Sequence, residues 1–416
     1  MTSQPWYSLL SSQIFFWGFQ GIFITFVAGS AWLVSGSANH RPFMPIVNNT
    51  PRTIRPEYDN AAVVTDDQLN TVLYKIRPRF KEQAPKINFI DHGLRLWGKS
   101  PQVGSDSLSG KQLYAMLTDH PTYTRNYGKK ATPLLSISSS GIAVTTRESR
   151  TSVSHVDHLM GTLSEIGTPL SYHVKTPELQ GTVGDILKHA VKNFRLNQRE
   201  YEWTALALAM YIKEGQHWFS NDGQRLDFNL IADRIMRQQQ PQGVCYGQHR
   251  LYTLTMLLRV NKQLRDESQN PILSAEQVAN IHDYLLDMSR RLYQSQSPDG
   301  YWDGNWFDAE SPVPDPTTNE LSRRLLATGH SLEWWAMAPQ TLHPPRETIV
   351  RAAQWMTRVI TEMDDESIAA NYTFLTHSAR SLVLWRGKFA DEVDVKVPEE
   401  ITNELEKETA NGLSKL

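Results

Sequence analysis

The stretch GVCYGQHRLYTLTMLLRV, residues 243–260, contains a helix that is apolar on every side, from His249 to Val260. The chain then continues into a helix with a single apolar stripe, formed by Val278, Ile281, Tyr284, Leu285, Met288 and Leu292. A helix that is apolar all round must be buried all round, whereas a striped helix covers a core and faces water. The stretch therefore predicts an inner and an outer helix that pack together, and we expect the chain to repeat this pair.

Striped and apolar helices alternate along the rest of the sequence. Striped helices are expected over residues 182–194, 228–237, 274–293 and 347–361, and apolar ones over 199–212, 249–260, 329–338 and 368–385. Two earlier pairs are expected from helices over residues 67–76, 88–97, 109–117 and 154–166. Six such pairs predict an all-α protein built as an α/α toroid, in which outer helices surround a ring of inner ones. Four pairs with an N-terminal subdomain are the alternative.

The predicted toroid domain, residues 61–389, carries one insertion at residues 119–151. Within it, PLLSISSSGIAVTTRES alternates apolar and polar residues around Ser-Ser-Gly, which predicts a β-hairpin. Residues 390–416 contain eight Asp or Glu against three Lys. This acidic composition is typical of a disordered tail.

The N-terminus contains an apolar run, Ile14–Val34, of 21 residues without a charge. As a helix this run is about 31 Å long, enough to cross a bilayer core. We therefore expect residues 1–36 to be an uncleaved transmembrane anchor whose partner is the lipid bilayer. A signal peptide cut near Gly36-Ser37-Ala38 is the alternative, although the preceding segment has no Lys or Arg. Residues 37–60 are Pro-rich and are expected to form an extended tether, and the side of the membrane that holds the body is left open.

Composition excludes some classes of protein. The chain has 416 residues, 40% of them hydrophobic, which suffices for a large core, and a net charge of -2. It shows no basic patch with interleaved aromatic residues, so a nucleic acid is not an expected partner. Its one cysteine, Cys245, excludes an intrachain disulfide framework.

Polar residues on the otherwise apolar helices are the candidates for function, because a buried polar side chain costs free energy unless it is partnered or used. Most lie near the start of an expected inner helix. They are His92, His155, Asp157, His158, Glu202, Cys245, His249, Arg250, His330, Glu333, His377 and Arg380. Parallel inner helices bring their N-termini to one rim, where the positive helix ends favour an anionic or carbonyl-bearing ligand. The expected ligand-binding residues are Glu202, Trp203, His249, Arg250, Trp334 and Arg380.

Metal binding is a competing interpretation of the same residues. Both His155-x-Asp157-His158 and Cys245-x3-His249 offer side chains that suit zinc. On a helix, however, the adjacent Asp157 and His158 project about 100° apart and cannot easily meet one ion. His155 and His158 can share a face and are weak metal candidates. No metal and no cofactor are expected.

A first resemblance rests on Gln296-Ser-Pro-Asp-Gly300-Tyr-Trp302. This segment resembles the Q-x3-G-x-W repeat that closes outer helices in the toroids of terpenoid cyclases and protein prenyltransferases. The carboxylate motifs of the cyclases are absent, and Gly243 stands where the prenyltransferases have a zinc-binding acid. The resemblance therefore implies the toroid fold rather than those reactions.

A second resemblance rests on Gly329-His330-Ser331-Leu332-Glu333-Trp334, which is similar to the G-H-x-x-E-W segment of N-acylglucosamine 2-epimerases and related sugar isomerases. The resemblance implies a sugar pocket that contains His330 and Glu333, with His377 as the second acid or base. The whole chain looks most like membrane-anchored toroid proteins of bacteria. The sequence thus favours a membrane-anchored toroid that binds a lipid, an isoprenoid or a sugar. The alternative is an acid–base sugar isomerase that uses the catalytic residues His330, Glu333 and His377.

Overall fold

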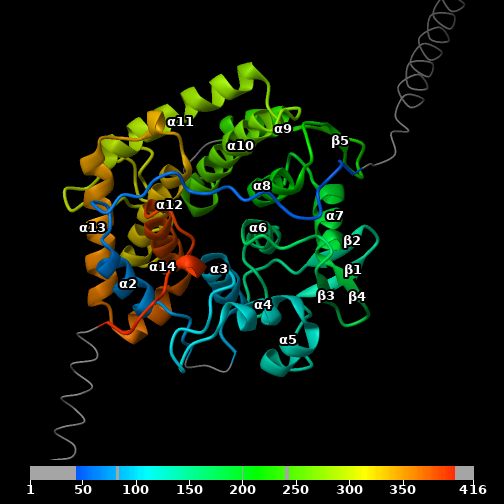
Figure 1. The fold of residues 1–416 in the computed structure, drawn as a ribbon, viewed down its shortest axis with the longest axis horizontal. Helices are drawn as coiled ribbons and strands as arrows, with labels where there is room; N and C mark the ends of the chain where they lie inside the picture. Colours follow the sequence, from blue (N-terminus) through cyan, green and yellow to red (C-terminus); the bar gives the residue numbers. More distant parts are fainter. Residues whose placement is uncertain (1–43, 81–83, 199, 239–242, 399–416) are drawn as a thin grey trace, which may run out of the picture.

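The computed structural model describes residues 44–80, 84–198, 200–238 and 243–398 (Figure 1). This part of the chain is mostly helical, which confirms the all-α prediction. Six helices that alternate with the central ones in the sequence are α2 (Asp66–Lys75), α4 (Gly110–Thr118), α7 (Val183–Asn193), α9 (Phe228–Met236), α11 (Ala275–Ser295) and α13 (Arg346–Glu362). The six central helices are α3 (Ile87–Trp97), α6 (His158–Glu165), α8 (Glu202–Tyr211), α10 (Gln248–Asp266), α12 (Glu320–Met337) and α14 (Asp365–Trp385).

The central helices contact one another in a closed order. Helix α3 contacts α6, α6 contacts α8, and the order continues through α10, α12 and α14 back to α3. In Figure 1 the other helices lie outside this group, with α13 and α2 on one side and α7 on the other. The central helices are buried almost throughout, as their all-round apolar sequences predict, and they form the core.

The helices begin where the capping residues of the sequence place them. Thr182 and Asp185 form a capping box at the start of α7, and Ser274 caps α11 through the backbone N–H of Gln277. Helix α6 is shorter than predicted because Asp157 adopts a left-handed conformation, with φ of 55°. His155 therefore lies in the loop before α6, while His158 is the first helical residue.

Short β-hairpins and one additional helix complete the described part of the fold. The predicted hairpin consists of β1 (Leu135–Ser138) and β2 (Gly141–Val144), an antiparallel pair in which Leu135 faces Val144. Two more antiparallel pairs are β3 (His173–Lys175) with β4 (Gln180–Thr182), and β5 (Trp218–Phe219) with β6 (Arg225–Leu226). The helix α5 (His120–Tyr127), within the insertion, was not predicted.

The Q-x3-G-x-W segment connects the outer helices α11 and α13 through hydrogen bonds. The side chain of Gln296 donates hydrogen bonds to the carbonyl oxygens of Gly300 and Thr348, and the indole of Trp302 donates to Leu292 O at 2.7 Å. Gly300 has φ of 106°, and a Cβ there would lie 2.5 Å from Arg351 O, so only glycine fits. This segment therefore fixes the end of α11 against α13.

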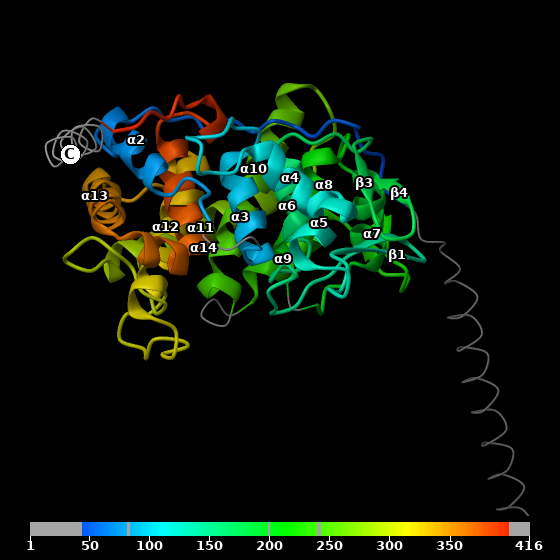
Figure 2. The ribbon, with the colours of Figure 1, turned by 90° about the horizontal axis from the view of Figure 1, so that it is seen from below.

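The described part of the predicted tether, residues 44–60, is extended but packed on the body. It pairs with the ends of two central helices, because Arg52 N donates to Met210 O at 2.8 Å and Asn60 N donates to Trp385 O at 2.8 Å. In Figure 2 this segment runs along one face of the body, together with the chain end near residue 390. Residues 44–60 thus belong to the folded body.

Two predicted terminal segments fall wholly or partly outside the described residues. These are the anchor, residues 1–36, and the acidic tail from residue 399 onward. The earlier part of the tail is ordered against α2, since Asn70 and Lys396 exchange two hydrogen bonds. Among the described residues, no helix is both long and apolar enough to cross a membrane.

Candidate functional site

A cavity of about 770 Å³ opens at the N-terminal ends of the central helices. Its walls come from the start of α3, the loops before α6 and α10, and the first half of α14. The C-terminal ends of α3, α6 and α14 border a different, smaller cavity, beside residues 50–55. Helices α3, α6 and α14 therefore point their N-termini the same way. The side chains at the floor of the larger cavity are His92, His155, Cys245 and His377.

Three of these side chains, His92, His155 and His377, belong to one cluster of six histidines, which come from five central helices and the loop before α6. In the first group, the ring of His330 lies 4.9 Å from that of His249 and 3.8 Å from that of His377, measured between centroids. In the second group, the rings of His92 and His158 stack at 4.2 Å. The two groups adjoin, because the rings of His92 and His377 are 5.2 Å apart. His155 lies beside both, 5.1 Å from His249 and 5.9 Å from His92.

Hydrogen bonds to oxygen fix the orientation of most of these rings. The Nδ1 atoms of His330 and His377 both face Glu333 Oε2, each at 3.2 Å. His158 Nδ1 lies 2.6 Å from Asp91 Oδ2, and His92 Nδ1 lies 2.8 Å from Asn88 O. Carbonyl and carboxylate oxygens can only accept, so each of these Nδ1 atoms carries the proton. In the neutral form of each ring, the lone pair is therefore on Nε2.

The Nε2 atoms of five rings are buried and have no hydrogen-bond partner within the described residues. They belong to His92, His158, His249, His330 and His377. A buried polar atom without a protein partner is uncommon, and in folded proteins such an atom usually binds a water or an ion. A ring whose Nδ1–H is held by a carboxylate or carbonyl, with Nε2 turned inward, is the usual arrangement of a metal-binding histidine.

Buried ion pairs hold Glu333 in place. Arg95 Nη1 lies 2.6 Å from Glu333 Oε1, and Arg380 Nη1 contacts the same oxygen. Both arginines also pair with Glu165, which accepts a hydrogen bond from the hydroxyl of Tyr252. Arg95 Nη1 is 3.4 Å from His377 Nδ1 as well, but the shorter carboxylate contact decides the tautomer of that ring. This network gives the histidine pair a rigid support.

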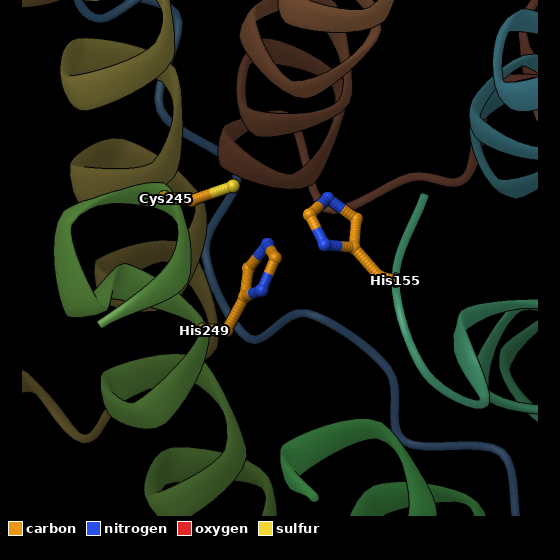
Figure 3. A group of neighbouring side chains, drawn as sticks. All are labelled: His155, Cys245 and His249. Carbon is orange, nitrogen blue, oxygen red and sulfur yellow. The ribbon is translucent and has the colours of Figure 1, made fainter. Parts of the chain in front are cut away.

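Cys245 and His155 both line the cavity and contact the other histidines of the cluster. Figure 3 shows the thiol of Cys245 and the rings of His155 and His249 pointing toward one another, and their ligand atoms lie within 4.8 Å of one another. His155 Nδ1 faces Glu200 Oε2 at 3.1 Å. Cys245 and Tyr246 both adopt left-handed conformations, with φ of 49° and 55°. Such strain is concentrated at functional sites, where surrounding structure must maintain it.

Burial and neighbouring charges set the protonation of the cluster. Burial, together with nearby histidines, lowers the pKa of His92, His158, His249 and His377 well below the usual value. Burial also opposes charge on His155, but contacts with Cys245 and Glu200 outweigh it and raise its pKa to about 10. Burial would raise the pKa of Cys245, yet His155 and His330 lower it to about 7. Neutral imidazoles and a thiolate are the forms that bind metals.

Three groups of side chains bring potential metal ligands within 4.8 Å of one another. They are His249 with His330 and His377, His155 with Cys245 and His249, and Asp91 with His92 and His158. Sequence analysis expected no metal and named His155 and His158 as weak candidates for a shared site. The structure places these two histidines in different groups, because the left-handed Asp157 separates His155 from the helix.

The residues predicted for catalysis lie together, but none of the six predicted to bind a ligand lines the larger cavity. His330, Glu333 and His377 are in direct contact, and only His377 lines the cavity. Glu202 pairs with Arg250 at 3.1 Å, and Trp203 packs against the rings of His158 and His249. Trp334 is buried beside Trp335, and Arg380 lines the smaller cavity. These side chains support the cluster or the core.

Sequence reasoning missed the residues that hold the cluster. Arg95, Glu165, Tyr252, Asp91 and Glu200 were not singled out, although each is buried and contacts a site residue or one of its partners. Arg95 and Glu165 could have been found as charges on otherwise apolar helices. Comparison with family models, with curated proteins and with solved structures gave no match, so the geometry of the site carries the functional argument.

Proposed function

We propose that the protein is a metal-dependent enzyme in which His249, His330 and His377 bind a first-row transition-metal ion. The observation that carries this proposal is the set of three buried, convergent imidazoles whose Nε2 atoms have no partner in the described chain. Glu333 holds two of the three rings from behind through Nδ1. Three protein ligands with an open further position are typical of catalytic rather than structural metal sites.

The ligand chemistry favours zinc, copper, iron or nickel. Imidazole nitrogen suits these ions, and a nearby thiolate, here Cys245, favours them further. Magnesium and calcium prefer oxygen ligands, which are not what this group offers. At such a site the ion would polarise a substrate oxygen or lower the pKa of a bound water to about 7.

The cavity favours a small polar substrate. Its lining combines Lys86, Asn88, Glu148, Arg150 and Asp315 with apolar side chains such as Phe89 and Phe374, and it contains no Trp. A sugar or a similarly polar molecule fits this lining better than an isoprenoid or a lipid. Cys245 and His155 lie where a substrate in the cavity would approach the ion.

The closed order of six central helices, each alternating in sequence with an outer one, supports an α/α toroid as the architecture. The apolar run Ile14–Val34 supports a membrane anchor for this toroid. The cavity would then be held near a membrane surface.

Acid–base isomerisation by His330 and His377 is less well supported. An acid or base must reach the substrate proton, and His330 does not line the cavity. Both rings turn Nδ1 to the ionised Glu333, and their Nε2 atoms are buried. His330 and His377 are better suited to bind a cation than to exchange protons with a sugar.

A nucleophilic cysteine is the second candidate. Cys245 lies in a strained turn immediately before α10, beside His155, whose other nitrogen faces Glu200. A thiol, an imidazole and a carboxylate in this order can form a covalent acyl intermediate. Protection of Cys245 from iodoacetamide by bound metal would favour the metal site, whereas alkylation unaffected by metal would favour the nucleophile.

The experiment for the proposed function measures the metal bound to the purified full chain. We expect a stoichiometric first-row metal by mass spectrometry, and its loss in His330→Ala. His173→Ala is the matched control, because His173 is exposed on β3, outside the cluster. A wild-type chain that neither retains nor binds any of these metals would refute the proposal.

A further inference from the structure

We propose that His92 and His158 hold a second transition-metal ion beside the first, so that the centre is binuclear. This inference rests on the proposed function, because it extends the same cluster. His249, His330 and His377 account for one ion and leave the His92–His158 pair unexplained. The sequence offers no sign of this pair, since one residue lies in α3 and the other begins α6.

The two rings are in direct contact, and their ring nitrogens are only half satisfied. They are stacked at 4.2 Å with an angle of 18° between their planes, and both are almost completely buried. Each Nδ1 is committed to an oxygen, Asn88 O for His92 and Asp91 Oδ2 for His158. Both Nε2 atoms are therefore buried with no donor among the described residues. One potential ligand atom from each of Asp91, His92 and His158 lies within 4.8 Å of the others, which is close enough for one cation beside the pair.

Asp91 supplies the second line of evidence. Its carboxylate is fully buried and contacts two neutral donors, His158 Nδ1 at 2.6 Å and the hydroxyl of Thr162 at 3.0 Å. Within the described chain, no Lys or Arg forms an ion pair with it, whereas Glu333 has both Arg95 and Arg380. A buried carboxylate without a counter-charge is costly to keep ionised, and burial raises the pKa of Asp91 to about 7. A metal ion on His158 Nε2 would supply that charge through the ring, as in carboxylate–histidine–metal triads.

The position of the pair next to the first ion completes the argument. The ring of His92 is 5.2 Å from that of His377, and His155 lies 5.9 Å from His92 and 5.8 Å from His158. His92 and His155 also line the cavity, so both ions would be reachable from it. Two ions about 3.5–4 Å apart can clamp one substrate oxygen or one bridging water between them. The substrate class would be a small polar molecule with an oxygen that can bridge two metals.

The test is a titration of the metal-free full chain with Co²⁺, followed by absorption and by metal analysis. Wild type should take up about two ions per chain, and His158→Ala about one, with the His173→Ala control unchanged. Asp91→Asn keeps the shape of the side chain and should weaken the second binding step alone by about 10–100-fold, so this variant serves if His158→Ala does not fold.

The outcomes separate the two proposals. One ion in wild type, lost in His330→Ala but retained in His158→Ala, would overturn the binuclear centre and leave the proposed function standing. No ion in wild type would overturn both. Copper offers an independent check, because a coupled pair of Cu²⁺ ions should give a much weaker paramagnetic resonance signal per copper than the single ion in His158→Ala. Full signal from two coppers in wild type would show that the ions are not neighbours.

Discussion

Arg95 Nη1 lies 2.6 Å from Glu333 Oε1, and both side chains are almost completely buried. Burial would raise the pKa of Glu333, but Arg95 and Arg380 hold it well below the usual range. The carboxylate is therefore ionised and can accept protons from two imidazoles at once. The positions of His330 and His377 thus depend on the ion pair between Glu333 and Arg95.

Glu333→Gln should damage both stability and metal binding. Loss of the Glu333 charge leaves two buried arginines without part of their counter-charge. Breaking a buried ion pair of this kind lowers the free energy of unfolding by about 3–5 kcal/mol. Loss of the carboxylate behind two metal-binding rings should also weaken metal affinity by about 10–100-fold. Denaturant unfolding and Co²⁺ titration measure the two effects. Glu276→Gln, on the exposed side of α11, is the control, and equal behaviour of the two variants would contradict the role of Glu333.

Gly161→Ala should disturb the histidine cluster through Trp203. A Cβ at this position would lie 2.7 Å from Trp203 Cε3, and Trp203 packs against the rings of His158 and His249. Overpacking of this kind costs about 1–3 kcal/mol, and it should lower metal affinity as well. Combining the change with Trp203→Phe, which removes part of the clashing ring, should recover some of the loss. Strictly additive effects in the double variant would show that the two residues are not coupled.

The repeat of helix pairs was readable from sequence because each helix carries its burial pattern locally. The stripes over α7 and α11 and the apolar run in α10 predicted those helices to within a few residues at most boundaries, although α10 continues to Asp266. The first part of α12, Glu320–Thr328, was missed because its two arginines and its mixed pattern resemble a loop. The contact between α14 and α3 completes the closed order of contacts among the central helices. It joins distant parts of the chain, which no local pattern encodes.

The site was only partly predictable for the same reason. Each histidine could be recognised as a polar residue on an apolar helix, and the contact of His330 with Glu333 follows from their spacing of three residues. The contact of His377 with Glu333, and that of His158 with Asp91, depend on how separate helices pack. The left-handed conformation of Asp157 could not be predicted from the sequence either. It places His155 in the loop before α6 and His158 at the start of that helix.

Metal affinity should rise with pH. Burial lowers the pKa of His330, but Cys245 and Glu333 outweigh burial, so its pKa lies above the usual 6.5. The proton on His330 must leave before Nε2 can bind an ion, and protons therefore compete with metal through this range. Apparent affinity for Co²⁺ should increase between about pH 6 and about pH 8. A flat profile would mean that His330 does not titrate with metal binding.

The segment before α2 should matter for stability and not for membrane binding. The Arg52 guanidinium donates to the carbonyl oxygens of Ile212 and Lys213 and to Gln269 Oε1, across the ends of the central helices. Hydrogen bonds from a charged group contribute about 1.5–3 kcal/mol, so Arg52→Ala should lower the free energy of unfolding by roughly that amount.

Two truncated chains separate this contribution from the anchor. A chain beginning at residue 44 should leave the membrane fraction and keep the full stability of the body, because it retains Arg52 and lacks the apolar run Ile14–Val34. A chain beginning at residue 61 should also be soluble, but it should unfold at lower denaturant because it loses every contact of residues 44–60. Fractionation with carbonate extraction and denaturant unfolding of both chains provide the measurement. Membrane retention of the chain from residue 44 would place the anchor elsewhere, and equal stability of the two chains would show that the segment adds nothing to the fold.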